Sequence, residues 1–207
     1  MIETAITVTQ GLNIDALCQQ LRTGQHIVFH AALYSNFAGS RVEQVLTDRL
    51  SSSPQTKLYL IEQAFDPSCG WHTEFGQILR QQLTLAEIEQ LFQQSRHWCQ
   101  KLHQLYPHQV EYLISDLLPC QPILVIDNHI FSGQYAHAEI GAPQGIWLQI
   151  NGQILAIDCA TTHSWLQQAA QLTELSPAQI SFYRYMAECR HVIKNATRFD
   201  STHVYKN

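Results

Sequence analysis

The sequence predicts an α/β fold: a mixed sheet with a parallel βαβ core, an antiparallel C-terminal meander and flanking helices. A β-favouring run at 26–33 is followed by a polar loop, a capped helix and a second run at 57–62. That order is typical of a βαβ unit, whose crossover implies parallel pairing. Later runs are joined by short turn signals, as in hairpins. The last part of the chain, 162–207, is predicted to be a C-terminal helical segment.

The bulk composition favours one soluble domain over residues 1–207. The chain has 207 residues, of which 45% are hydrophobic and 14% charged, so a sizeable core can form. No apolar run approaches the roughly 18 residues that span a bilayer, and the N-terminus lacks a basic leader. The six cysteines form no CxxC pair, which favours reduced thiols. We therefore expect a cytoplasmic protein with no membrane contact.

The first elements are short. Residues 2–9 alternate weakly and predict an edge strand or a loose arm. Asn13 is predicted to cap a helix that runs through Arg22, and Gly24 to close it. The run 26–33, HIVFHAAL, then predicts a buried strand.

Capping signals locate the helices. Pairs with capping-box spacing are Ser40 with Glu43, Thr84 with Glu87 and Ser176 with Gln179. They predict helices that end near 50, 105 and 195, and shorter helices are predicted at 73–81 and 163–172.

Further strands are predicted at 110–115, 122–127 and 129–133, the last two joined by a tight turn at Asp127-Asn128. GIWLQI and QILAID flank Asn151-Gly152, which predicts a hairpin with a type I′ turn.

The loop after the strand 26–33 is the first candidate site. It lies at the carboxyl end of a predicted parallel strand and the amino end of a helix, where α/β sheets place ligands. Polar side chains there, together with backbone amides, predict binding of a small anion, and the residues are His30, Tyr34, Ser35, Asn36 and Ser40. In the alternative, Ser40 only caps its helix and Asn36 only turns the chain.

The stretch 119–148 is the second candidate site, because it holds Asp127, His129, Tyr135, His137 and Glu139. In an extended segment His137 and Glu139 share one face, and His129 joins them across the hairpin. These three are candidate metal ligands, although a zinc site needs more than a pair. A surface pair of this kind is often merely solvated, and we predict no cofactor.

The same stretch resembles the second half of the phospholipase D-like superfamily motif, in which a histidine, a lysine and an aspartate precede a glycine-containing segment. Asp127 matches the family aspartate and Gly133 the glycine six residues on. Cys120 and Pro122 stand where the histidine and lysine are expected, and Gln134 and Ala136 replace the family serine and asparagine. Over residues 12–137 the resemblance implies a degenerate half without the catalytic pair, in which Asp127 survives as a turn residue.

The net charge and the aromatic side chains of the sequence predict which partners the protein binds. The net charge is −5 and no lysine or arginine cluster occurs, so we expect no general nucleic-acid binding. The segment 182–185, FYRY, has more rings than one helical stripe buries, which predicts a protein partner or a homodimer.

The sequence thus favours a non-catalytic, cytosolic accessory or regulatory domain that binds a protein partner or a small ligand. One alternative is a hydrolase or phosphodiesterase-type enzyme that uses His30, Asp127, His129 and His137 as acids and bases. The other is a His/Glu metal-binding module. Catalysis is left open, with a non-enzyme favoured.

Overall fold

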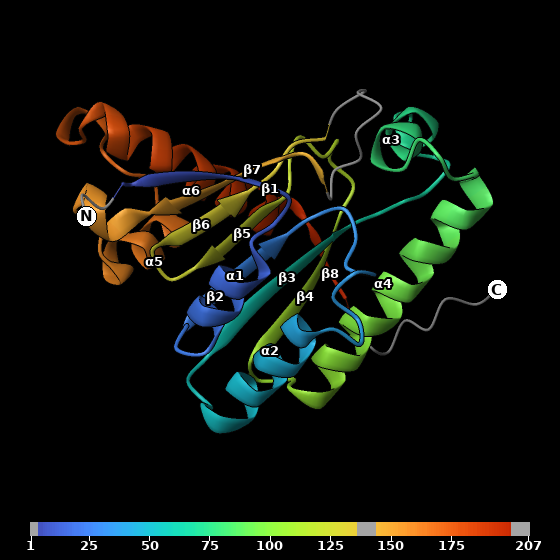
Figure 1. Cartoon of the computed structure of the whole chain (residues 1–207), viewed down its shortest axis with the longest axis horizontal. Helices are drawn as coiled ribbons and strands as arrows, with labels where there is room; N and C mark the ends of the chain where they lie inside the picture. The colour runs from blue at the N-terminus through green and yellow to red at the C-terminus, as the bar shows by residue number, and fades with distance from the viewer. Residues whose placement is uncertain (1–3, 136–143, 200–207) are drawn as a thin grey trace.

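The computed structural model describes residues 4–135 and 144–199. These residues form a single eight-stranded mixed sheet with strand order β1-β7-β6-β5-β2-β3-β4-β8, and helices cover both of its faces (Figure 1). The predicted α/β class, with its parallel core, antiparallel meander and flanking helices, is confirmed. Every helix in the described ranges is too short or too polar to span a bilayer.

The parallel core consists of β2 (His26–His30), β3 (Lys57–Gln63) and β4 (Val110–Ser115). Helix α2 (Arg41–Ser52) connects β2 to β3, and it is the capped helix that the sequence predicted there. The next connection contains α3 (His72–Leu79) and the long α4 (Leu85–Leu105). The carboxyl ends of the three parallel strands therefore share one edge of the sheet.

The antiparallel part consists of β5 (Ile123–Ile126), β6 (His129–Ser132) and β7 (Ile146–Asn151). Strand β5 pairs with β2, and β1 (Ile6–Gln10) pairs with β7 at one edge of the sheet. The first strand is thus an edge strand rather than a loose arm. Helix α1 (Ile14–Leu21) follows it, with Asn13 as its N-cap.

Side-chain alternation along β2 separates two cores. Ile27 and Phe29 join the core beneath α1, α2 and α4, whereas Val28 joins the core beneath α5 (Cys159–Gln167) and α6 (Pro177–Asn195). A smaller cluster lies between α3 and α4 and includes Phe75 and Phe92.

The hairpin predicted at Asn151-Gly152 is wrong. Strand β7 ends at Asn151, whose side chain caps a 3₁₀ helix, η2 (Gly152–Leu155). The Gly152 amide donates to the Asn128 carbonyl oxygen at 2.8 Å, and a Cβ at Gly152 would meet that oxygen at 2.6 Å. The glycine is needed for a close approach between segments, and this contact overrides the local turn preference.

The C-terminal elements also differ from expectation. Helix α5, capped by Asp158, begins at Cys159, four residues before the predicted start, and η3 (Leu172–Glu174) occupies the predicted helix end. The two-residue strand β8 (Thr197–Arg198) pairs with β4 and was not foreseen.

The aromatic segment of α6 does not need a partner to cover it. Phe182 is 1% exposed and Tyr183 8% exposed, and Tyr185 packs half-buried against the α5–α6 core. Residues of α5 and η2 cover these aromatic side chains, and the sequence pattern does not show where those residues lie. The observation that motivated a homodimer or protein partner is therefore absent.

Candidate functional site

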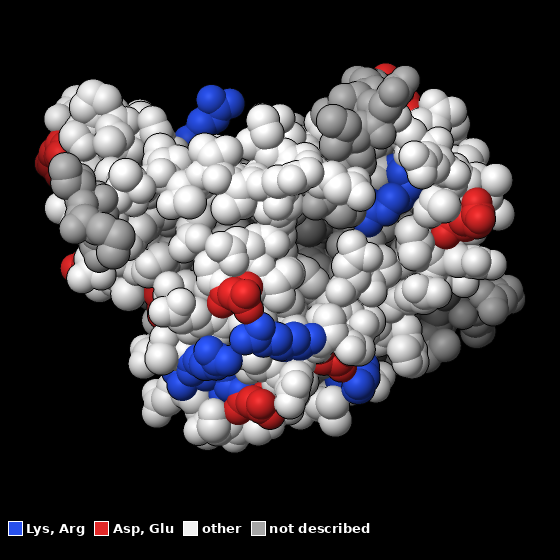
Figure 2. All heavy atoms as spheres, viewed as in Figure 1, with Lys and Arg blue, Asp and Glu red and all other residues white. Residues whose placement is uncertain are grey.

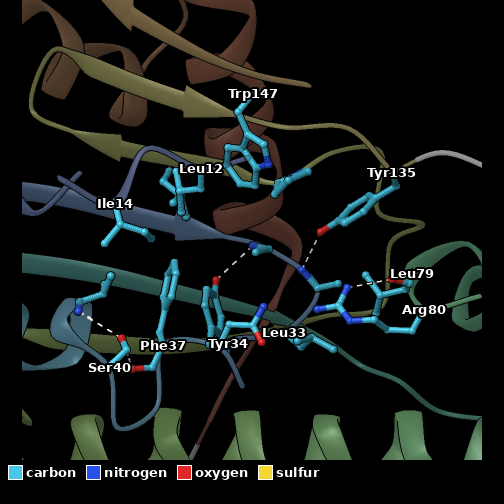
Figure 3. Close-up of a pocket in the computed structure, with 16 residues that line it drawn as sticks. Leu12, Ile14, Leu33, Tyr34, Phe37, Ser40, Leu79, Arg80, Tyr135 and Trp147 are labelled. Carbon is cyan, nitrogen blue, oxygen red and sulfur yellow. Dashed lines mark hydrogen bonds between the residues drawn. The ribbon is translucent and has the colours of Figure 1, made fainter. Parts of the chain in front are cut away.

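A cavity of about 350 Å³ opens at the carboxyl end of β2. Figure 2 shows a hollow in the surface of the molecule, and the residues around it are almost all uncharged. The charged side chains gather lower in this view, over α1 and α2. The walls of the cavity come from the start of α1, the loop 31–40, the end of α3, the β5 region and β7. Most of the wall is apolar or aromatic, including Leu12, Ile14, Phe37, Leu79 and Trp147 (Figure 3).

Tyr34 forms the floor of the cavity. Its buried hydroxyl lies 2.7 Å from the Phe29 carbonyl oxygen and 2.6 Å from that of Ile61, and it accepts a hydrogen bond from the Ala31 amide. The Tyr34 amide in turn donates to Ser95 Oγ of α4 at 2.7 Å. Burial raises the pKa of Tyr34 well above its usual value. Its polar atoms are thus used by the fold, and its ring is the part that remains to line the cavity.

Ser40 is also used by the fold, as a helix cap. Its hydroxyl accepts from the Val42 amide and donates to the Phe37 carbonyl oxygen. The neighbouring Gly39 amide donates to Glu43 Oε2 at 2.6 Å, and Lys101 pairs with the same carboxylate. A carboxylate therefore already occupies the helix start where a small anion was predicted. The structure therefore supports the alternative, in which Ser40 only caps its helix.

The two remaining polar residues of the loop, Ser35 and Asn36, differ in whether they line the cavity. Asn36 is exposed and lines the cavity, with no hydrogen bond of its side chain in the described part of the chain. Ser35 is not among the lining residues, and its buried hydroxyl has no partner there either. Only Asn36 of these two is placed to meet a ligand.

Arg80 and Tyr135 form the polar end of the cavity (Figure 3). The Tyr135 hydroxyl accepts from the Ala32 amide at 2.9 Å, which leaves its own proton to be donated. Arg80 Nη1 donates to the Leu79 carbonyl oxygen at 2.8 Å. Burial lowers the pKa of Arg80 and raises that of Tyr135.

Trp147 is held in the cavity wall by a close packing contact. A Cβ on Gly133 would lie 2.7 Å from the Trp147 indole, so only a glycine fits beneath the ring. Gly133, which matches the family glycine in the resemblance above, thus has a packing role that does not depend on that family.

His30 lies on the other face of the sheet. By alternation it shares the face of Val28 and the α5–α6 core, and it is 3% exposed. Burial lowers its pKa to about 4, so it is neutral near pH 7. It does not line the cavity.

Asp127 and His129 lie at the opposite end of β2. Asp127 forms the tight β5–β6 turn with a φ of 51° and accepts from the Gln25 and His26 amides. Four strand steps, about 13 Å, separate His26 from His30. His30, Asp127 and His129 therefore do not converge, and the acid–base site predicted from them is wrong.

The predicted metal site rests on residues of which only His129 is described. His137 and Glu139 lie outside the described residues. In the described remainder, no group of three or more histidine, cysteine, aspartate or glutamate side chains is arranged to hold a metal ion.

Sequence reasoning missed most of the cavity wall. Leu12, Ile14, Arg80 and Trp147 come from three distant segments, and none carries a local motif. Tyr34, Asn36, Ser40 and Tyr135 were singled out, but as polar ligand contacts rather than as parts of an apolar wall.

Comparison with known proteins gives little. No family model matches the chain, and no curated protein matches it. Among similar solved structures is one described as TrmBL2, an archaeal chromatin protein with a novel mode of DNA binding. That likeness has a TM-score of 0.47 at 11% sequence identity and covers 96% of this chain. The chain spans 54% of that protein, about half its length.

The description of TrmBL2 as DNA-binding contradicts two predictions made from the sequence. One is the accessory or regulatory role with a protein partner or small ligand as its target. The other is the absence of general nucleic-acid binding. A likeness at this TM-score assigns no ligand to this chain, so what the chain binds has to follow from its own geometry. The resemblance to the phospholipase D-like superfamily stays a prediction.

Proposed function

We propose that this chain binds one compact, mostly apolar organic molecule in the cavity at the carboxyl end of β2. The observation that carries the proposal is the cavity itself, about 350 Å³ with mainly apolar and aromatic walls. Pockets of this size and character, with a few placed polar groups, are typical small-molecule sites.

The walls support binding without rearrangement of the floor. Tyr34 is tied to β2, β3 and α4, and Trp147 is positioned by its contact with Gly133. Each methylene that leaves water contributes about 0.8 kcal/mol, so an eight-carbon chain contributes roughly 6 kcal/mol before association losses. Because association losses lower this figure, dissociation constants between about 1 mM and 0.1 mM are expected for such simple probes.

A cytoplasmic location belongs to this proposal. All six cysteines are free thiols in the structure, and two of them, Cys120 and Cys159, are exposed. Free thiols persist most readily in a reducing compartment.

The test is a titration with two neutral probes, octan-1-ol and naphthalene, followed by calorimetry and by the shift in Tm. Ala31→Leu adds bulk to the cavity wall, and Ala38→Leu, on an exposed position of the same loop that does not line the cavity, is the matched control. We expect both probes to bind the wild type and Ala38→Leu, and to bind Ala31→Leu at least about tenfold more weakly.

Duplex DNA is titrated in parallel, because the neighbour described above binds DNA. Equal probe binding by Ala31→Leu would place the site elsewhere and overturn the proposal. Saturable DNA binding without binding of either probe would replace it with a nucleic-acid function.

A further inference from the structure

We infer that the ligand of this cavity is an amphiphilic carboxylate, with its apolar body against the aromatic end and its carboxylate on Arg80. This inference rests on the proposed function and adds the chemical class of the ligand.

The first argument is the position of Arg80. It follows α3 directly, lines the cavity, and its side chain extends towards Leu33 at one end of the cavity (Figure 3). Leu12, Ile14 and Phe37 lie at the other end. The cavity therefore has one charged end and one apolar end, which matches a molecule with a single polar head.

The second argument is the missing counter-ion. The arginine and lysine ion pairs among the described residues are Arg41–Asp15, Lys101–Glu43 and Arg198–Glu111. In the same part of the chain Arg80 has no carboxylate partner, and its hydrogen bond to the Leu79 carbonyl uses only one of five guanidinium donors. A cation partly removed from water is unfavourable unless an anion accompanies it. An anionic ligand supplies the counter-ion that the described residues do not.

The third argument is the presence of a second donor. Tyr135 lines the same end of the cavity as Arg80 (Figure 3). Because Tyr135 accepts from the Ala32 amide, its proton is available for an oxygen of the ligand. A guanidinium fork and a hydroxyl together suit the two oxygens of a planar carboxylate.

The charge of the cavity wall also disfavours a ligand whose head group is cationic or neutral. A cationic head meets like charge at Arg80, and a neutral alcohol leaves the guanidinium without an anion. Among the described residues that line the cavity there is no aspartate or glutamate side chain. The order of affinity should therefore be carboxylate, then alcohol, then ammonium.

The test compares octanoate, octan-1-ol and octylammonium, which share one apolar chain, on the wild type and two variants. Arg80→Met keeps an apolar stem of similar length and removes the charge. Arg184→Met, at an exposed position on α6, is the matched control. Circular dichroism and Tm confirm that each variant is folded.

We expect the wild type and Arg184→Met to bind octanoate at least about tenfold more tightly than octan-1-ol. Arg80→Met should lose this preference and keep its affinity for the alcohol. Arg80→Lys, which keeps the charge but not the fork, should retain part of the preference.

Three outcomes overturn the inference. Equal binding of octanoate and octan-1-ol by the wild type rejects the carboxylate and leaves the apolar site standing. A parallel loss of alcohol and octanoate binding in Arg80→Met shows a structural effect. Failure of all three probes and of naphthalene to bind the wild type rejects the proposed function itself.

Discussion

Tyr112 donates a hydrogen bond to the Glu62 carboxyl group in the core between the sheet and α4. Glu62 is fully buried, and its second carboxyl oxygen has no partner among the described residues. Burial raises the pKa of Glu62 to about 7, although the bond from Tyr112 and the nearby Arg96 oppose the rise. The carboxyl group is therefore half-protonated near neutral pH.

The stabilising contribution of Glu62 should fall as the pH rises from about 4.5 to about 7, because the folded protein holds a proton there that the unfolded chain has released. The contribution of Glu62 is on the order of 3 kcal/mol. Urea unfolding of the wild type and Glu62→Gln across this range measures it. The variant should lose this contribution, and an unchanged pH profile would contradict the assignment.

His30 should act in the opposite direction. Its folded pKa of about 4 lies below the ordinary 6.5, so the unfolded chain binds the proton first and stability is lost as the pH falls through this window. Between about pH 4.5 and 6.5 the two contributions oppose each other. Glu62→Gln should reveal stability that falls on acidification, and His30→Gln should reveal stability that falls on alkalinisation. Two flat profiles would show that neither group is perturbed.

Asp127 should matter for stability as a turn residue. Asp127→Ala removes the acceptor for the Gln25 and His26 amides and puts alanine at a φ of 51°, a loss of roughly 3 kcal/mol. Asp127→Asn keeps an acceptor and tolerates that φ, so its loss should be about 1 kcal/mol. The control is Asp15→Ala, which breaks an exposed ion pair with Arg41 and should cost less than about 1 kcal/mol. Equal losses in Asp127→Ala and Asp15→Ala would reject the turn role.

Features that depend on neighbours in sequence were predictable. The capping boxes at Thr84 and Ser176 form as expected, and Asp127 turns the chain between β5 and β6. At Ser40 the cap forms, but the reciprocal bond reaches Gly39 rather than Ser40 itself. Such signals act within a few residues, so tertiary packing seldom changes them.

Features that depend on distant contacts were not predictable. Residue 152 has to be glycine because the Asn128 carbonyl oxygen lies against it. Phe182 is buried by elements whose packing cannot be recognised from the neighbouring sequence. The cavity combines segments from α1 to β7, and Arg80 becomes significant only beside Tyr135. Alternation along β2 also sends His30 away from the loop that follows it.

Tyr34 has a consequence for the speed of binding. One side chain bridges the point where β2 and β3 separate, and its amide fastens the same loop to α4. The ligand proposed above would meet a floor that is already assembled, so little ordering entropy should be lost on association. Association should be fast and nearly independent of which molecule enters, so that the lifetimes of the complexes, rather than their rates of formation, distinguish one ligand from another.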